Sequence, residues 1–222
     1  MRLCICLFGI LLLPILVVAQ PFTGRIRYTL TRGDSTGLQL DPYMADTLVY
    51  TIAEQGVRLD SQGHGRHFVH TARSWPLLYL ADSGAIYLLD TARRVAYRRK
   101  VALFRLAGQP VVKWEQELPP VQLLAYACRQ RRGTFVHEMG GGPVQYTVAY
   151  SPALRYPVAN PLEDARYETD LAGAIPLLKE WKYLRQDLVL RQQAIQIDAL
   201  PVQLALPMGY ELRPFEPDMQ PE

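Results

Sequence analysis

Three histidines spaced three residues apart, His64, His67 and His70, form the pattern most suggestive of chemistry. Imidazole is a common zinc ligand, and on a helix all three side chains would share one face. The glycines on both sides of His64 disfavour a helix, and on a strand His67 would point away from the other two. Asp60 is the one carboxylate nearby that would add to the set. We therefore predict exposed turn histidines and no metal site.

Two glycine-containing segments resemble catalytic or phosphate-binding loops only in part. Asp34 and Ser35 lie within Gly33–Gly37, but the chain has no Gly-x-Ser-x-Gly sequence, which marks a serine nucleophile. Asp and Ser at such positions are ordinary turn formers. The run of three glycines at 140–142 has no following helix and no Lys-Ser/Thr partner, so it predicts a hairpin tip.

Carboxylate pairs, which could do general acid–base work, follow a predicted helix start. Asn160-Pro161 is typical of a helix cap and first turn, and Glu163, Asp164, Glu168 and Asp170 come after it. Acidic residues near a helix start are explained by the helix dipole and by solvation. We therefore predict no catalytic residues and no bound cofactor, and we interpret the chain as a protein that is not an enzyme.

The first 19 residues carry the pattern of an export signal. Arg2 precedes an apolar run from Leu3 to Val18, and Ala19 closes a small-residue cleavage pattern before Gln20. This pattern predicts a cleaved signal peptide at 1–19, no transmembrane segment after cleavage, and a periplasmic or secreted protein. The alternative is an uncleaved anchor, for which the run is shorter than the ~20 residues that a span needs.

Cysteine placement fits this interpretation. Cys4 and Cys6 lie at the start of the apolar run, where they cannot become a lipid-modified first mature residue. Cys128 is then the only mature cysteine, so no intrachain disulfide can form. Its apolar neighbours favour a buried, inert thiol over a reactive one.

Charge is nearly balanced, with a formal net charge of +3. This value gives no reason to expect a nucleic-acid partner. Short basic clusters occur at Arg93-Arg94, at Arg98–Lys100 and at Arg129–Arg132. Such clusters are usually solvated strand faces and turns, and a contact with anionic lipid or another polyanion is the alternative.

The elements that must position these residues are mostly strands. Apolar and polar residues alternate from Phe22 to Thr31, as in a half-buried strand. Similar runs, separated by turn residues, occur at 47–53, 57–62, 77–80, 85–89, 95–107, 111–116, 127–137 and 144–150. Segment 32–46 is predicted as a loop, and Pro119-Pro120 should end the strand before it. The pattern predicts one mainly β domain over 20–222, a large curved antiparallel sheet with one or two short helices.

The last third of the chain contains three further apolar runs, within 171–184, 187–198 and 202–215. Leu204 and Leu206 alternate with polar or small residues, which predicts a closing strand with one face in the apolar interior. Pro207 should end that strand, and Gly209 should allow a bend after it. Trp75, Trp114 and Trp181 are expected in the core or along a groove, since strands favour aromatic residues.

Four segments carry a resemblance that spans nearly the whole mature chain. They are Phe22–Tyr28, Tyr126–Cys128, Leu171–Leu178 and Leu206–Tyr210. In their order they resemble secreted Gram-negative domains of unknown function, the GLPGLI-type group, which are similar in shape to the LolA/LolB-like lipoprotein carriers. The Gly-Leu-Pro-Gly-Leu-Ile motif itself is not literal here, because Ala174 and Ile175 stand between Gly173 and Pro176. The resemblance implies an antiparallel half-barrel whose concave side faces a helix or an apolar groove, and it implies no catalytic residues.

Two function classes follow from these observations. The first is an exported binding module that holds a lipid, an acyl chain or a partner's hydrophobic segment in a concave sheet. The second is a structural or interaction component of the cell envelope that binds no ligand, with an envelope protein or lipoprotein as partner. A hydrolase ranks behind both.

Overall fold

The structure is a computed structural model, and it describes residues 21–34, 36–39, 47–63, 75–101, 112–137, 142–162, 171 and 173–215. The predicted signal peptide lies outside these residues, as do the three histidines and the four carboxylates that follow Asn160–Leu162. Predictions for those segments therefore remain predictions.

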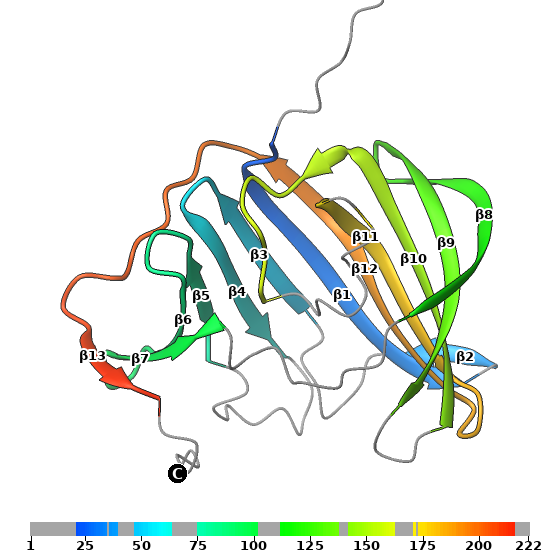
Figure 1. Cartoon of the computed structure of the whole chain (residues 1–222), viewed down its shortest axis with the longest axis horizontal. Helices are drawn as coiled ribbons and strands as arrows, with labels where there is room; N and C mark the ends of the chain where they lie inside the picture. The colour runs from blue at the N-terminus through cyan, green and yellow to red at the C-terminus, as the bar shows by residue number, and fades with distance from the viewer. Residues whose placement is uncertain are drawn as a thin grey trace, which may run out of the picture.

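Thirteen strands form a single sheet, drawn in Figure 1. In chain order they are β1 (Gly24–Asp34), β2 (Gly37–Gln39), β3 (Thr47–Ala53), β4 (Gly56–Gln62), β5 (Leu77–Leu80), β6 (Ala85–Asp90), β7 (Val95–Lys100), β8 (Lys113–Leu123), β9 (Tyr126–His137), β10 (Gly142–Arg155), β11 (Ala174–Tyr183), β12 (Leu188–Ala199) and β13 (Glu211–Pro214). The spatial order is β13-β7-β6-β5-β4-β3-β1-β12-β11-β10-β9-β8, with β2 paired to β1.

At the centre of the sheet, the first strand of the described chain pairs with its last long strand, β12. β1 lies between β3 and β12, and it pairs with both in antiparallel register. From β3 the chain runs strand by strand to β7, and from β8 it returns strand by strand to β12. The segment 200–210 then crosses to the far edge, where β13 pairs with β7 in parallel (Figure 1). The expected mainly antiparallel sheet is thus confirmed, and it is an open one.

The ladder registers define two faces, because residues paired directly across strands project to the same side of a sheet. We call the side that bears Ile26, Tyr28 and Tyr50 the inner face, and the opposite side, which bears Arg25 and Arg27, the outer face. On β1 the inner residues Ile26 and Tyr28 are buried and the outer arginines are exposed, the alternation that the sequence predicts.

Buried side chains form clusters on both faces. The largest lies on the inner face around Tyr28, Tyr50 and Ile52, where the rings of Tyr28 and Tyr50 meet edge to face at 5.4 Å. On the outer face, Leu78, Tyr87 and neighbouring side chains of β5–β7 form another cluster. Of these three short strands, β6 is buried along its whole length, because segment 200–210 packs on its outer face. On β7 only the first three residues are buried.

The predicted closing strand is wrong in its hydrogen bonding but right in its packing. Residues 201–207 belong to no strand, yet Leu204 and Leu206 pack on the outer-face cluster while Gln203 and Ala205 are exposed. The backbone N–H of Leu204 lies 3.5 Å from the Gln55 side-chain oxygen in the β3–β4 turn. The segment 200–210 alternates like a strand because one of its sides faces an apolar surface. We call residues 200–210 the strap.

Other boundaries also differ from the prediction. β8 continues through Pro119-Pro120 to Leu123 instead of ending there, with a register shift between Leu118 and Val121. This is possible because β8 is an edge strand, where a missing N–H costs no ladder hydrogen bond. The predicted loop after Thr31 contains the end of β1 and its short hairpin with β2.

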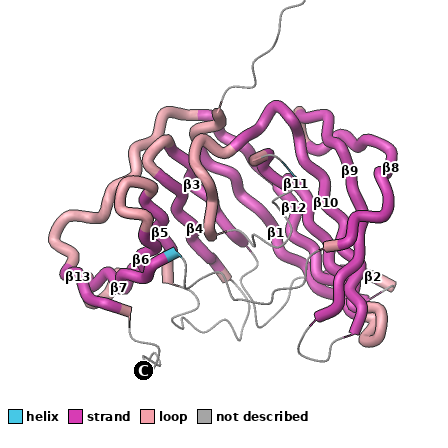
Figure 2. The backbone as a smooth tube through the Cα atoms, viewed as in Figure 1, coloured by secondary structure: helices cyan, strands magenta, loops and turns pink. Residues whose placement is uncertain are grey.

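Helical geometry is limited to Val101 and Leu171 within the described residues, so Figure 2 shows almost only strands and loops. The predicted cap hydrogen bond is present, since the Leu162 N–H donates to Asn160 Oδ1 at 3.1 Å. Pro161 and Leu162 form a turn, and the rest of that predicted helix lies outside the described residues. In this part of the chain no helix is both long and apolar enough to cross a bilayer.

Candidate functional site

A row of aromatic side chains crosses the inner face on the later half of the sheet. Consecutive ladder partners run Arg32, Leu190, Trp181, Tyr146, Gly133 and Trp114, from β1 to β8. Because each pair projects to the same side, Trp181, Tyr146 and Trp114 form one band. Their ring centroids are 5.5 Å apart for Tyr146–Trp181 and 5.9 Å apart for Trp114–Tyr146.

Gly133, in the same row as the band, lets the chain at the start of β8 approach β9 closely. A Cβ built at Gly133 would lie 2.6 Å from the Lys113 carbonyl oxygen and 2.6 Å from Val112 Cγ1. Two residues before Gly133, Arg131 places its guanidinium 4.6 Å from the Trp114 ring centroid, and its Nε is 2.9 Å from Glu117 Oε1. The carboxylate fixes the guanidinium over the ring, so the end of the band combines an aromatic surface with a neutralised charge.

The neighbouring row places polar groups deep in the same face. It runs Leu30, Gln192, Lys179, Val148, Arg131 and Glu117. Lys179 is 4% exposed and Gln192 is 5% exposed, although Lys and Gln are normally surface residues. The two are direct cross-strand partners. Within the described residues, Gln192 Nε2 has no hydrogen-bond partner.

A buried amide that lacks a hydrogen bond costs about 1–3 kcal/mol of stability. Such groups are few in folded proteins, and each calls for an explanation such as a bound water or ligand. The candidate site is therefore the inner face around Gln192 and Lys179, beside the band of Trp181, Tyr146 and Trp114.

The structure places the residues singled out from the sequence in different settings. Trp114 and Trp181 line the band as expected, whereas Trp75 belongs to another cluster and stacks on Tyr97 at 5.5 Å.

Asp34 Oδ1 accepts hydrogen bonds from the Thr36 N–H at 2.8 Å and the Gly37 N–H at 3.3 Å, which makes it the predicted turn former. These bonds, with one from the Thr36 hydroxyl, lower the pKa of Asp34. Ser35 lies outside the described residues.

Cys128 is buried, as predicted, with 1% of its surface exposed. Burial raises the pKa of its thiol above the ordinary value. A thiol in this setting remains protonated at neutral pH and is a poor nucleophile.

Lys179, Gln192 and Tyr146 were not recognised from the sequence. A signal for Lys179 is present in the sequence, because Ile175, Leu177 and Trp181 lie at even spacings from it along the strand. They therefore face the same side as Lys179, which places a lysine on an apolar face. The pairing of Lys179 with Gln192 has no comparable local signal, because it depends on the register between β11 and β12.

Comparison with known proteins gives no relative. The chain matches no family model and no curated protein. Within the described residues, no three His, Cys, Asp or Glu side chains are grouped so that they could hold a metal ion. The physical character of the two faces therefore carries the functional argument.

The outer face is strongly polar, and its basic side chains outnumber its acidic ones. The ladder registers place these basic residues on it: Arg25, Arg27, Arg58, Arg98, Lys100, Lys113, Arg132, Lys182 and Arg191. The acidic residues placed there in the same way are Asp60, Glu180 and Asp198. Asp60 binds Arg58 at 2.7 Å and Glu180 binds Arg191 at 2.5 Å, so these carboxylates are already matched by cations.

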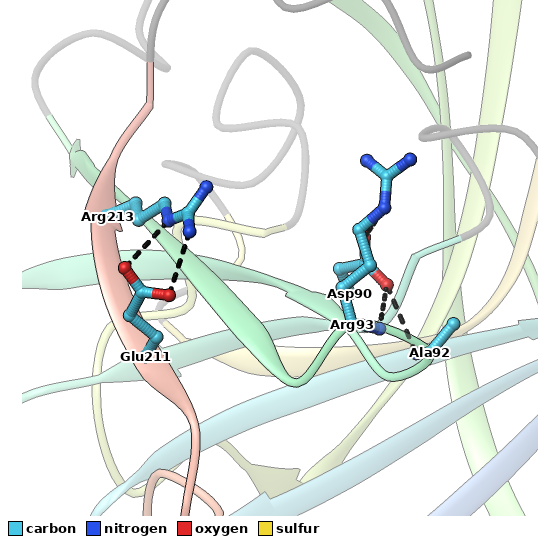
Figure 3. A network of polar contacts seen from close by, with 5 residues as sticks. All are labelled: Asp90, Ala92, Arg93, Glu211 and Arg213. Carbon is cyan, nitrogen blue, oxygen red and sulfur yellow. Dashed lines mark hydrogen bonds and ion pairs between the residues drawn. The ribbon is translucent and has the colours of Figure 1, made fainter.

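The edge at β7 and β13 has its own polar contacts, shown in Figure 3. Asp90 Oδ1 accepts hydrogen bonds from the N–H groups of Ala92 at 3.1 Å and Arg93 at 2.9 Å, which closes the β6–β7 turn. On β13, the Arg213 guanidinium donates to both oxygens of Glu211 at 2.9 Å. This pair lowers the pKa of Glu211 and raises that of Arg213.

Proposed function

We propose that the protein is an exported binding module that holds the hydrophobic part of an amphipathic ligand, a lipid or acyl chain or a partner's apolar segment, against its inner face. It performs no catalysis in this proposal. The open sheet serves as the scaffold in this proposal, a role suggested by the resemblance of the sequence to the lipoprotein carriers.

The buried Gln192 amide is the observation that carries the proposal. Its Nε2 lacks a partner among the described residues, and it lies beside the aromatic band, in which Trp114 and Trp181 are only partly buried. Ligand sites in proteins commonly combine such an apolar lining with a few polar groups that orient the ligand. An ester or carboxyl oxygen of a lipid would accept the hydrogen bond that Gln192 can donate.

Lipid binding is tested first on the protein as purified. Organic extraction followed by mass spectrometry should recover a lipid in stoichiometric amount. The delipidated protein should then bind the fluorescent fatty acid cis-parinaric acid in a saturable manner. Absence of both an extracted lipid and saturable binding would refute the proposal.

A matched pair of variants locates the site. Gln192→Leu removes the amide and keeps the volume, and it should weaken cis-parinaric acid binding roughly tenfold, about the value of one hydrogen bond. The free energy of unfolding of this variant should not fall, because an unsatisfied group has been removed. Gln193→Leu, on the outer face, should leave binding unchanged. Equal effects of the two variants would contradict the assignment.

One observation favours the second function, an envelope component with a filled core and no ligand. Val144, Tyr146 and Val148 are all 0% exposed, so protein atoms already cover much of the inner face. In that case the purified protein carries no lipid, and Gln192→Leu is more stable than the native chain with no change in any binding.

A further inference from the structure

We infer that the outer face, at the end where β1 and β4–β7 meet the strap, docks on an anionic lipid surface. This surface is distinct from the inner face to which the proposed function belongs. The inference rests on a broad field of exposed cations and on two exposed apolar side chains at the β7–β13 edge.

The cations are spread over the width of the sheet. Arg25, Thr51, Arg58, Leu78, Tyr87 and Arg98 are consecutive ladder partners from β1 to β7 and project to the outer face. Five strand spacings separate Arg25 from Arg98, a distance of roughly 24 Å. A single small anion cannot contact both ends of such a row, whereas a charged surface can.

The exposed charges at the two ends of this row are doubled. Arg27 lies two residues beyond Arg25, and Lys100 lies two residues beyond Arg98, each on the same face as its neighbour. All four side chains are exposed. Arg58, in the middle of the row, is already held by Asp60 at 2.7 Å. Asp198, the ladder partner of Arg25, projects to the same side and offsets part of its charge. The outward field therefore comes mainly from Arg27, Arg98 and Lys100, with a smaller part from Arg25.

Two exposed apolar side chains at the β7–β13 edge decide between lipid and other polyanions. Met208 is 98% exposed at the turn that ends the strap, and Leu212 is 56% exposed on β13. Leu212 pairs with Ala96, so it projects to the same face as Arg98. On either side of Met208, Leu206 and Tyr210 pack on the outer-face cluster and hold the turn in place. A nucleic acid or polysaccharide gains nothing from such groups, whereas a bilayer interface accepts them.

The expected strength follows from the charges. Each Lys or Arg near an anionic leaflet contributes roughly fivefold in partitioning at physiological salt, about 1 kcal/mol. Four such residues and two apolar groups are enough for measurable, salt-sensitive binding.

The test is cosedimentation of the full mature chain with vesicles. The native protein should pellet with vesicles of phosphatidylcholine mixed with phosphatidylglycerol, and it should be released by high salt. It should not pellet with pure phosphatidylcholine. Binding to neither kind of vesicle, or equal binding to both, would overturn the inference.

Variants then separate the charges from the apolar groups. Arg98→Gln with Lys100→Gln should lower partitioning roughly 30-fold, two contributions of the size given above. Met208→Ser with Leu212→Ser should lower it roughly tenfold for vesicles and leave retention on immobilised heparin unchanged. Arg155→Gln with Arg185→Gln, which removes one exposed charge at the end of β10 and one in the β11–β12 turn, is the matched control and should change neither.

Two outcomes of this series would contradict the lipid assignment. Equal losses for the control and for the Arg98/Lys100 variant would show that net charge alone drives binding. Tight heparin binding together with vesicle binding that ignores Met208 and Leu212 would assign the face to a polyanion. Gln192→Leu should retain full vesicle binding, so failure of the inner-face proposal is distinguishable from failure of this one.

Discussion

Tyr28 ties the first strand to a segment far along the chain. Its hydroxyl, on a side chain only 1% exposed, donates a hydrogen bond of 2.8 Å to the Pro176 carbonyl. Tyr28→Phe keeps the ring and removes that hydrogen bond. We expect the free energy of unfolding to fall by about 1–2 kcal/mol, measured by urea denaturation. Unchanged stability would mean that water replaces the hydroxyl.

The Cys128 thiol provides a pH test. Burial raises its pKa above the value of 9.0 that it would have in the unfolded chain. Stability from this group is therefore fully present below pH 9.0 and is lost as the pH rises through the folded pKa. Cys128→Ala should remove this loss of stability at alkaline pH, measured by urea denaturation across that pH range.

The reactivity of the thiol is a second test. In native protein at pH 8 the thiol should react with an aromatic disulfide reagent far more slowly than in urea. Rapid native reaction would show an accessible thiolate instead.

At the scale of an element, the strap is held by alternate side chains and not by a ladder. Leu204 is half-buried against the outer-face cluster, and Gln203 next to it is exposed. We expect Leu204→Ala to lower the free energy of unfolding by about 1–2 kcal/mol, less than a fully buried leucine would. Gln203→Ala should change it by less than about 0.5 kcal/mol. Equal effects in thermal or urea unfolding would mean that the strap does not pack as described.

β9 offers a second element-scale test, at Gly133. A side chain there would meet backbone and Val112 atoms at 2.6 Å, so Gly133→Ala should destabilise the protein by about 1–3 kcal/mol. Gly37→Ala is the matched control, since a Cβ at Gly37 has no heavy atom within 4 Å. Near-ultraviolet circular dichroism should report disturbance of Trp114 and Tyr146 in the first variant only.

Which elements the sequence predicts well depends on where their determinants lie. β1, β3 and β4 follow from period-2 alternation and from turn residues, which are local. The strap shows the same alternation but lies over side chains, and the sequence does not distinguish a sheet neighbour from an apolar surface. β8 passes Pro119-Pro120 because it is at an edge, and position in the sheet is a property of the whole topology. The pairing of Lys179 with Gln192 depends on register for the same reason.

For the whole molecule, sheet position predicts local stability. β1 and β12 are paired on both sides, whereas β13 and β8 pair with one neighbour each among the described strands. Hydrogen exchange should therefore be slowest for the N–H groups of β1 and β12 and fastest for those of β13. The control is the same measurement on Tyr28→Phe, which should speed exchange in β1 first. Uniform protection across the sheet would contradict this picture.

The pairing of β1 with β12 also sets an order in time. Gly24 is the ladder partner of Ala199, so one side of the earliest described strand has no partner until almost the whole chain has been synthesised. Until then β1 presents an open edge with apolar side chains, the kind of segment that aggregates or recruits a chaperone. Contacts of such long sequence separation also slow folding. A nascent chain arrested before β12 should thus bind chaperones and remain sensitive to protease, and it should become resistant only once the last long strand is available.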